Sequence, residues 1–376
     1  MDKLLFTPGP LTTSITVKKA MLSDVGSRDY EFIEKVNYVR NELLFLAGVS
    51  KQDGYESIIM QGSGSFGIES VISSVLSNDA NILIIINGAY GERISDMAKV
   101  HNIKQTRMVF PEHECPDLSK LEDVLKSNPY ITHMAVVHCE TTTGIVNSIE
   151  EIGLLAKKYD KTYIVDAMSS FGAIPIHMAE CNIHYLISSS NKCIEGVPGF
   201  SFVIANRCKL EESEGNARTL VLNLHAQWKG MERDGQFRFT PPTHAILAFE
   251  QALKELEIEG GISGRAHRYK ENHQRLIKGM RDIGFAEYLA PEKQSYIITS
   301  FVYPKHPRFN FKEFYNRLNH KGLVIYPGKV SHSDCFRIGN IGRIFQEDID
   351  KLLRNIKETL QEMEILVGSE NGVVAW

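Results

Sequence analysis

The chain has 376 residues, of which 43% are hydrophobic and 23% charged, and its formal net charge is −4. A chain of this length exceeds one simple core, so we expect one large and one smaller domain, or two of similar size. The composition is that of an ordinary globular protein without a dominant basic surface, which disfavours nucleic acid as a partner.

The start of the chain and its cysteines bear on location. The segment MDKLLFTPGP has too short an apolar run before its Thr-Pro-Gly-Pro break for a signal-peptide core or a membrane span. The six cysteines lack paired or metal-ligand spacing and are typical of a reducing compartment. We therefore expect a cytoplasmic protein without a structural metal.

From about residue 55 to 206, short β-branched runs alternate with helix-length amphipathic stretches. The runs are YESIIM, NILIII, IKQTRMVF, ITHMAVVH, KTYIVD, IHYLIS and FSFVIAN. Such alternation is typical of an α/β layer built on a mostly parallel sheet, here of seven strands. Between the fourth and fifth runs, Ser148 and Glu151 have the spacing of a capping box and predict the start of a helix.

The C-terminal half indicates a second, smaller unit. Between about 208 and 243 the pattern is polar and without clear periodicity, so we expect an irregular and functional or interfacial segment. Helical spans at 244–258 and 262–283 lead into strand-like segments and a final helix near 346–364. The expected division is a large domain over 15–260, a smaller α+β domain over 261–364 joined by residues 1–14, and a tail over 365–376.

The stretch MQGSGSFGIES follows an apolar run and opens a helix. Ser63, Gly64 and Ser65 could present N–H groups and hydroxyls at that helix N-terminus, where a phosphate is favoured. The stretch lacks the GK[ST] of a nucleotide P-loop and the acidic residue that follows a dinucleotide fingerprint. A plain Gly/Ser turn would have the same sequence, so the loop alone does not identify a ligand.

Asp166 and Lys192 complete the pattern. Asp166 ends the run KTYIVD, at the carboxyl end of a buried strand, where ligands bind in open α/β sheets and where an Asp can also cap a turn. Lys192 lies in the small-residue loop SSSNKCIEGVPG. With the phosphate loop, these residues match the needs of pyridoxal phosphate: an amine for a Schiff base, an anion beside the pyridine nitrogen, and a phosphate anchor.

Further motifs follow in a characteristic order. They are FTPGP, GSGSFGIES, NGAYGER, HCETTTGI, VDAMSSFGAIP, SSSNKCIEGVPG, FTPPTHAI and FRIGNIG. As an ordered set they resemble the class V aminotransferases, which are pyridoxal-phosphate-dependent enzymes of fold type I. The resemblance extends from Thr7 to about Glu364 and implies that α/β fold.

The resemblance also implies roles for the residues of the first motifs. Lys192 would form the Schiff base and shuttle the proton, and Asp166 would partner the pyridine nitrogen. The cofactor phosphate would lie on Ser63, Gly64 and Ser65.

Other implied contacts come from further loops. Tyr90 in NGAYGER would place its ring over the cofactor face. Thr143 would reach the cofactor and Thr142 the substrate, although which of the three threonines starting at Thr141 contacts the cofactor stays open. Thr240 in FTPPTHAI would reach the phosphate from a second subunit, which implies a homodimer with the active site at the subunit interface.

Arg337 in CFRIGNIG would bind the acidic group of the substrate, because a guanidinium makes two parallel hydrogen bonds to a carboxylate or phosphonate. Within the family the motifs most resemble those of enzymes that act in phosphonate degradation and transfer the amino group of 2-aminoethylphosphonate to pyruvate. We expect this reaction, with phosphonoacetaldehyde and alanine as products.

Three alternatives remain at this point. An alanine:glyoxylate or serine:pyruvate aminotransferase would use the same residues, since Arg337 suits either anion. A cysteine desulfurase fits less well, because no flexible Gly/Ser-rich loop presents Cys335 as a nucleophile. A cofactor-binding protein without catalysis would be expected to have lost Lys192 or Asp166, and both are present.

Overall fold

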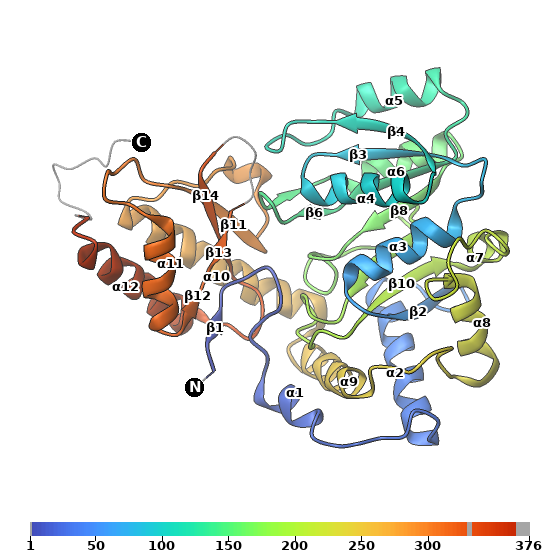
Figure 1. Cartoon of the computed structure of the whole chain (residues 1–376), viewed down its shortest axis with the longest axis horizontal. Helices are drawn as coiled ribbons and strands as arrows, with labels where there is room; N and C mark the ends of the chain where they lie inside the picture. Colours follow the sequence, from blue (N-terminus) through green and yellow to red (C-terminus); the bar gives the residue numbers. More distant parts are fainter. Residues whose placement is uncertain (1, 329–332, 366–376) are drawn as a thin grey trace.

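The computed structural model describes residues 2–328 and 333–365. A seven-stranded sheet in the order β2-β10-β9-β8-β5-β3-β4 forms the centre of the larger part (Figure 1). Its strands are β2 (Tyr55–Gln61), β3 (Asn81–Ile86), β4 (Lys104–Val109), β5 (His133–Val137), β8 (Thr162–Asp166), β9 (Tyr185–Ser189) and β10 (Phe200–Asn206). Neighbouring strands are parallel except at β10, which is antiparallel to both β2 and β9. The expected seven-stranded, mostly parallel sheet is confirmed, and each predicted run contains one strand.

The burial of the strands explains why these runs form a sheet covered on both faces. Every residue of β3, with the sequence NILIII, is buried, as expected for a central parallel strand. The edge strand β4 has the sequence KQTRMV and contains no buried residue. Its charged and polar side chains protect the sheet edge from pairing with another chain.

Helices cover the sheet of the larger part. They are α1 (Ile15–Ala20), α2 (Tyr30–Leu46), α3 (Gly64–Val75), α4 (Ala89–Val100), α5 (Leu118–Ser127), α6 (Ile149–Lys158), α7 (Arg207–Glu212), α8 (Leu224–Asp234) and α9 (Thr243–Ile258). Two short strands, β6 (Cys139–Glu140) and β7 (Ile145–Val146), form a hairpin after β5. Helices α3 and α4 directly follow β2 and β3, so their N-termini lie at the carboxyl edge of the sheet.

The predicted capping box before α6 is wrong in its hydrogen bonds, although the helix starts where expected. Ser148 is the N-cap residue but its side chain makes no capping bond. The ψ of Ser148 is 75°, which departs from the extended backbone that brings an N-cap hydroxyl within reach of the first N–H groups of the helix. The N–H of Ile149 donates to the Asn147 carbonyl at 2.9 Å.

The expected irregular segment between about 208 and 243 is also partly wrong, because it contains most of α7 and all of α8. The Asn223 side chain caps α8 by accepting from the Ala226 N–H, and Gly235 ends it with φ of 73°. Leu224, Trp228 and Met231 are buried on one face. The cap residues and this i, i+4, i+7 spacing were signals of a helix that the polar character of the stretch obscured.

The smaller part packs around its own sheet and core (Figure 1). The strands β11 (Ile298–Val302), β14 (Cys335–Gly339) and β13 (Tyr326–Pro327) pair in that order, and β1 (Leu4–Leu5) pairs with β12 (Leu323–Val324). The helices are α10 (Gly261–Ile283), α11 (Phe311–His320), α12 (Gln346–Glu362) and the 3₁₀ turn η1 (Pro291–Lys293). The helices expected at 244–258, 262–283 and near 346–364 are confirmed as α9, α10 and α12.

The ends of the chain bear on the expected domain division, which stays a prediction. Phe6, next to β1, is buried in the core of the smaller part. Ile365, the first residue of the expected tail, is buried in the same core, and 366–376 lie outside the described residues. None of the helices in the described part combines the length and apolar character needed to cross a bilayer.

Candidate active site

The expected phosphate loop, Tyr90, Asp166 and Lys192 come from loops at one edge of the central sheet. Because β2 and β9 are both antiparallel to β10, they point the same way as β8, β5 and β3. The loops after β2, β3, β8 and β9 therefore meet at the carboxyl edge. In open α/β sheets this edge is the usual place for a ligand.

A cavity of about 180 Å³ lies at this edge. Its lining residues are Ser63, Gly64, Ser65, Ile68, Tyr90, Arg93, Ile94, Met97, Asp166, Met168, Ser189, Asn191 and Lys192. The structure thus brings together the expected phosphate loop, the aromatic residue, the carboxylate and the lysine from four separate loops. Thr142, Thr143, Thr240 and Arg337 are not among the lining residues.

The phosphate loop ends at a helix N-terminus that faces the cavity. Ser63 is the extended N-cap of α3, and its side chain makes no capping bond. The first N–H groups of a helix have no acceptor within the helix, so they and the helix dipole favour an anion. A Cβ at Gly64 would collide with the Met168 side chain. Glycine at this position therefore keeps the loop close to the cavity wall.

Asp166 is a buried carboxylate at the end of β8. Only 4% of the residue is exposed, and Oδ1 accepts from the Met168 N–H at 2.9 Å. Burial raises the pKa of Asp166 to about 6, against the opposing effects of the Met168 N–H, Lys192 and Arg93. A cationic ring nitrogen beside this carboxylate would stabilise its charged form.

Lys192 is an amine poised for nucleophilic chemistry. Its Nζ donates to the Pro8 carbonyl at 2.7 Å, in the N-terminal FTPGP motif. Burial lowers the pKa of Lys192 to about 8, and the charge of Arg337 contributes in the same direction. A lowered pKa increases the share of neutral amine, which is the nucleophilic form. With the anion site and Asp166, this donor set fits pyridoxal phosphate.

Sequence reasoning missed two residues around Tyr90. Arg93, one turn further along α4, lies 4.8 Å from the Tyr90 ring centroid and donates to Ser65 Oγ at 3.3 Å. Glu140 is fully buried and accepts from the Gly91 N–H at 2.8 Å and from Thr142 Oγ1 at 3.0 Å. The i, i+3 spacing in AYGER was a signal for Arg93, whereas the contacts of Glu140 depend on the fold.

The three consecutive threonines are buried and do not line the cavity. The Thr142 hydroxyl is bonded to Glu140, and the Thr143 hydroxyl accepts from the Ile145 N–H at 3.3 Å. These bonds stabilise the turn between β6 and β7. The contacts of Thr142 and Thr143 with substrate and cofactor stay predictions.

Thr240 lies at the surface, outside the cavity of its own chain. It lines a separate surface cavity of about 330 Å³ with Arg28 and Arg238. Its carbonyl accepts from the Gln61 side chain at 3.3 Å. The structure contains a single chain, so the contribution of Thr240 to a second subunit stays a prediction.

Arg337 links the smaller sheet to the turn of Thr141, Thr142 and Thr143 between β6 and β7, which we call the threonine turn. Only 1% of the residue is exposed, and its guanidinium donates to the Pro327 carbonyl from Nε and Nη2 and to the Thr141 carbonyl from Nη1, at 3.0, 2.8 and 2.7 Å. Burial lowers the pKa of this group. To bind a substrate anion, Arg337 would have to exchange some of these carbonyl bonds, and its substrate role stays a prediction.

Residues 14–339 match the family Aminotransferase class-V. The 2-aminoethylphosphonate–pyruvate transaminase of Salmonella paratyphi C (strain RKS4594) is 52% identical, covering 95% of this chain and 97% of its own. That of Klebsiella pneumoniae subsp. pneumoniae is 51% identical with the same coverage.

Among solved structures, ureidoglycine-glyoxylate aminotransferase from Bacillus subtilis has a TM-score of 0.89 at 20% identity, covering 99% of this chain and 96% of its own. Alanine–glyoxylate aminotransferase from Nostoc sp. has a TM-score of 0.87 at 24% identity, covering 96% of each chain. At these identities the likeness concerns the fold alone, and it confirms the expected fold type.

Proposed function

The chain belongs to the class V aminotransferases, a pyridoxal-phosphate-dependent family, and we propose that it transfers the amino group of 2-aminoethylphosphonate to pyruvate. The products are phosphonoacetaldehyde and L-alanine. The observation that carries this substrate assignment is the identity of about half of all residues, over nearly the whole chain, to transaminases of that name. The cavity residues support the cofactor chemistry independently.

The central residues have distinct tasks in this reaction. When bound, pyridoxal phosphate supplies an aldehyde that takes up the amino group and a ring that accepts electrons from the adjacent carbon. Lys192 would hold the cofactor through Nζ, and once the substrate amine takes its place, the freed Nζ can take the proton from the amino-bearing carbon of the substrate. Asp166 holds a positive charge on the ring nitrogen. The lowered pKa of Lys192, about 8, leaves a share of neutral amine near neutral pH.

The remaining residues bind and orient. The N-terminus of α3, with Ser63, Gly64 and Ser65, supports binding of the cofactor phosphate, and Tyr90 covers the cofactor face from the cavity wall. Thr143 would contact the cofactor.

Substrate contacts come from the boundary between the two parts. Thr142 contacts the substrate, and Arg337 binds its phosphonate or carboxylate after releasing carbonyl bonds. Both residues belong to the contact between the threonine turn and the smaller sheet, where Ser300 Oγ donates to the Thr142 carbonyl and Arg337 to the Thr141 carbonyl.

Assembly and location are part of the same proposal. A homodimer would let Thr240, at the surface of its own chain, reach the cofactor phosphate of the other subunit. The free cysteines of the described chain support a reducing, cytoplasmic location.

The experiment that tests the proposal offers 2-aminoethylphosphonate, alanine and serine separately to the purified protein at equal concentration. The visible absorption of the bound cofactor reports which amine converts it. We expect 2-aminoethylphosphonate to act fastest, and Lys192→Ala, the control, to show no conversion. Because alanine is a product, it should also convert the cofactor through the reverse half-reaction. Conversion by alanine without conversion by 2-aminoethylphosphonate would therefore refute the phosphonate assignment and favour an alanine:glyoxylate aminotransferase.

A further inference from the structure

Glu195, in the same loop as Lys192, has an unusual environment. Its φ of +68° lies in the left-handed region that disfavours residues other than glycine. The residue is 3% exposed, so its carboxylate is removed from water. A strained backbone and a buried charge both require the surrounding structure to hold them.

One helix supplies the groups that hold Glu195. From α10, Arg268 Nη2 lies 2.7 Å from Glu195 Oε1, the Tyr269 hydroxyl donates to the same oxygen at 2.5 Å, and Arg265 Nη1 lies at 3.5 Å. Arg265 Nη1 also donates to the Cys193 carbonyl. The N–H of Glu195 donates to the Lys192 carbonyl at 2.7 Å, which closes a turn on the lysine itself.

The same helix residues hold the chain that follows β14, the strand of Arg337. Arg268 Nη1 donates to the Gly342 and Ile344 carbonyls at 2.6 and 3.1 Å. The Tyr269 hydroxyl accepts from the Gly342 N–H at 3.0 Å. The start of α10 therefore contacts both the lysine loop of the larger part and the exit of the substrate strand of the smaller part.

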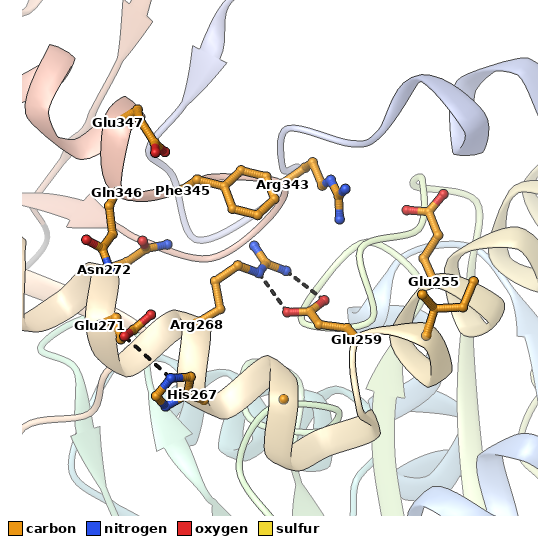
Figure 2. Close-up of a pocket in the computed structure, with 12 residues that line it drawn as sticks. Glu255, Glu259, His267, Arg268, Glu271, Asn272, Arg343, Phe345, Gln346 and Glu347 are labelled. Carbon is orange, nitrogen blue, oxygen red and sulfur yellow. Dashed lines mark hydrogen bonds and ion pairs between the residues drawn. The ribbon is translucent and has the colours of Figure 1, made fainter.

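Glu259, at the end of α9, binds the opposite side of the two arginines. It lies 2.8 Å from Arg265 Nε and 2.7 Å from Arg268 Nε. Figure 2 shows Arg268 bonded to Glu259 at the wall of a cavity of about 670 Å³, opposite Arg343 and Phe345. The side-chain hydrogen bonds and ion pairs of Glu259 run to the two arginines and not to the lysine loop. It is therefore the matched control for Glu195.

We infer that Glu195 is a positioning residue, which with Arg265 and Arg268 fixes the Lys192 loop against the segment that directly follows the strand of Arg337. The inference rests on the proposed function, in which these two residues act on one substrate. Charge balance of the two buried arginines does not explain why one of their two carboxylates, Glu195, lies at a strained backbone position. Its contact with the lysine turn accounts for the position of the second carboxylate.

The experiment compares Glu195→Gln with Glu259→Gln, each of which removes one carboxylate from the same pair of arginines. Turnover, thermal unfolding and the rate of pyridoxal phosphate uptake by cofactor-free protein are measured, the last across pH. Uptake needs no substrate, so it decides the role of Glu195 even if 2-aminoethylphosphonate proves not to be the donor. The charged and titratable groups facing Lys192 are Asp166, Arg337, Cys139 and Cys193, and both variants retain them.

We expect Glu195→Gln to lower kcat about 10–100-fold with KM changed less than about threefold, the loss typical of a misplaced reacting group. The midpoint of uptake should move to higher pH, since a loosened Lys192 loses the burial that lowers its pKa. Glu259→Gln should lower the unfolding temperature but leave kcat within about threefold of wild type. Glu195→Asp, which keeps the charge, should recover part of the rate.

Equal effects of Glu195→Gln and Glu259→Gln on kcat and on the pH midpoint of cofactor uptake would overturn the inference. A Glu195→Gln protein with wild-type kcat and a wild-type uptake midpoint would also overturn it. If Glu195→Gln does not fold, Arg268→Lys replaces it. This variant keeps a charge but loses the fork that joins Glu195 to the Gly342 and Ile344 carbonyls. It should lower kcat and shift the uptake midpoint in the same direction, and wild-type values of both would overturn the inference.

Discussion

Replacement of Lys192 by methionine should stabilise the cofactor-free protein although it abolishes turnover. Burial lowers the pKa of Lys192 from 10.5 to about 8, so the folded protein disfavours the charged form. This destabilisation is fully present below pH 8 and is lost as the pH rises from 8 through 10.5, because only the unfolded chain remains protonated in that window.

The magnitude follows from the size of the shift. The cost of the charged amine is about 3 kcal/mol at pH 7 and about 1 kcal/mol at pH 9.5. Methionine also removes the hydrogen bond from Lys192 Nζ to the Pro8 carbonyl, whose loss offsets about 1 kcal/mol. The variant should therefore gain about 2 kcal/mol at pH 7 and almost nothing at pH 9.5.

Urea unfolding of the cofactor-free wild type and Lys192→Met at both pH values measures this gain. Lys19→Met, at an exposed position of α1, is the control and should show no pH-dependent difference from wild type. A wild type that is the more stable protein at pH 7, or a gain of equal size at both pH values, would refute the reasoning.

Three further substitutions have defined outcomes. Asp166→Asn should weaken cofactor binding and slow single-turnover conversion of the cofactor by several orders of magnitude, and an unchanged rate would leave Asp166 as a turn cap only. Arg337→Ala should raise KM for 2-aminoethylphosphonate and for pyruvate together in steady-state kinetics, because losing the contact costs about 2–5 kcal/mol of binding free energy, and Arg337→Lys should recover part of it. A rise in KM for one substrate only would exclude a shared anion site. Asn223→Ala should cost about 1 kcal/mol in urea unfolding through loss of the α8 cap, and no change would contradict that cap.

Sequence patterns predicted the layer structure well because it depends on local composition. Runs such as NILIII are short, apolar and rich in β-branched residues, which favours a strand buried on both faces. The same logic places Asp166 at the end of one strand and Lys192 in the loop after the next strand, so their meeting in one cavity was predictable.

Contacts between distant segments were not predictable in the same way. Arg268 and Glu195 are 73 residues apart, and Arg337 and Thr141 are 196 residues apart. Their pairing depends on how the smaller part packs on the larger one. The failure at Ser148 has a local cause, since the residue type fits a cap but its ψ of 75° does not.

Transfer of labelled nitrogen tests the central claim most directly. Purified protein with pyridoxal phosphate is incubated with ¹⁵N-labelled 2-aminoethylphosphonate and unlabelled pyruvate, and the products are followed by mass spectrometry. The proposed function predicts ¹⁵N-alanine and phosphonoacetaldehyde in equal amounts, and neither product with Lys192→Ala. Alanine without the label would contradict the proposed function. A parallel incubation with ¹⁵N-labelled alanine and glyoxylate provides the second check: labelled glycine there, with no phosphonoacetaldehyde in the first incubation, would also contradict it.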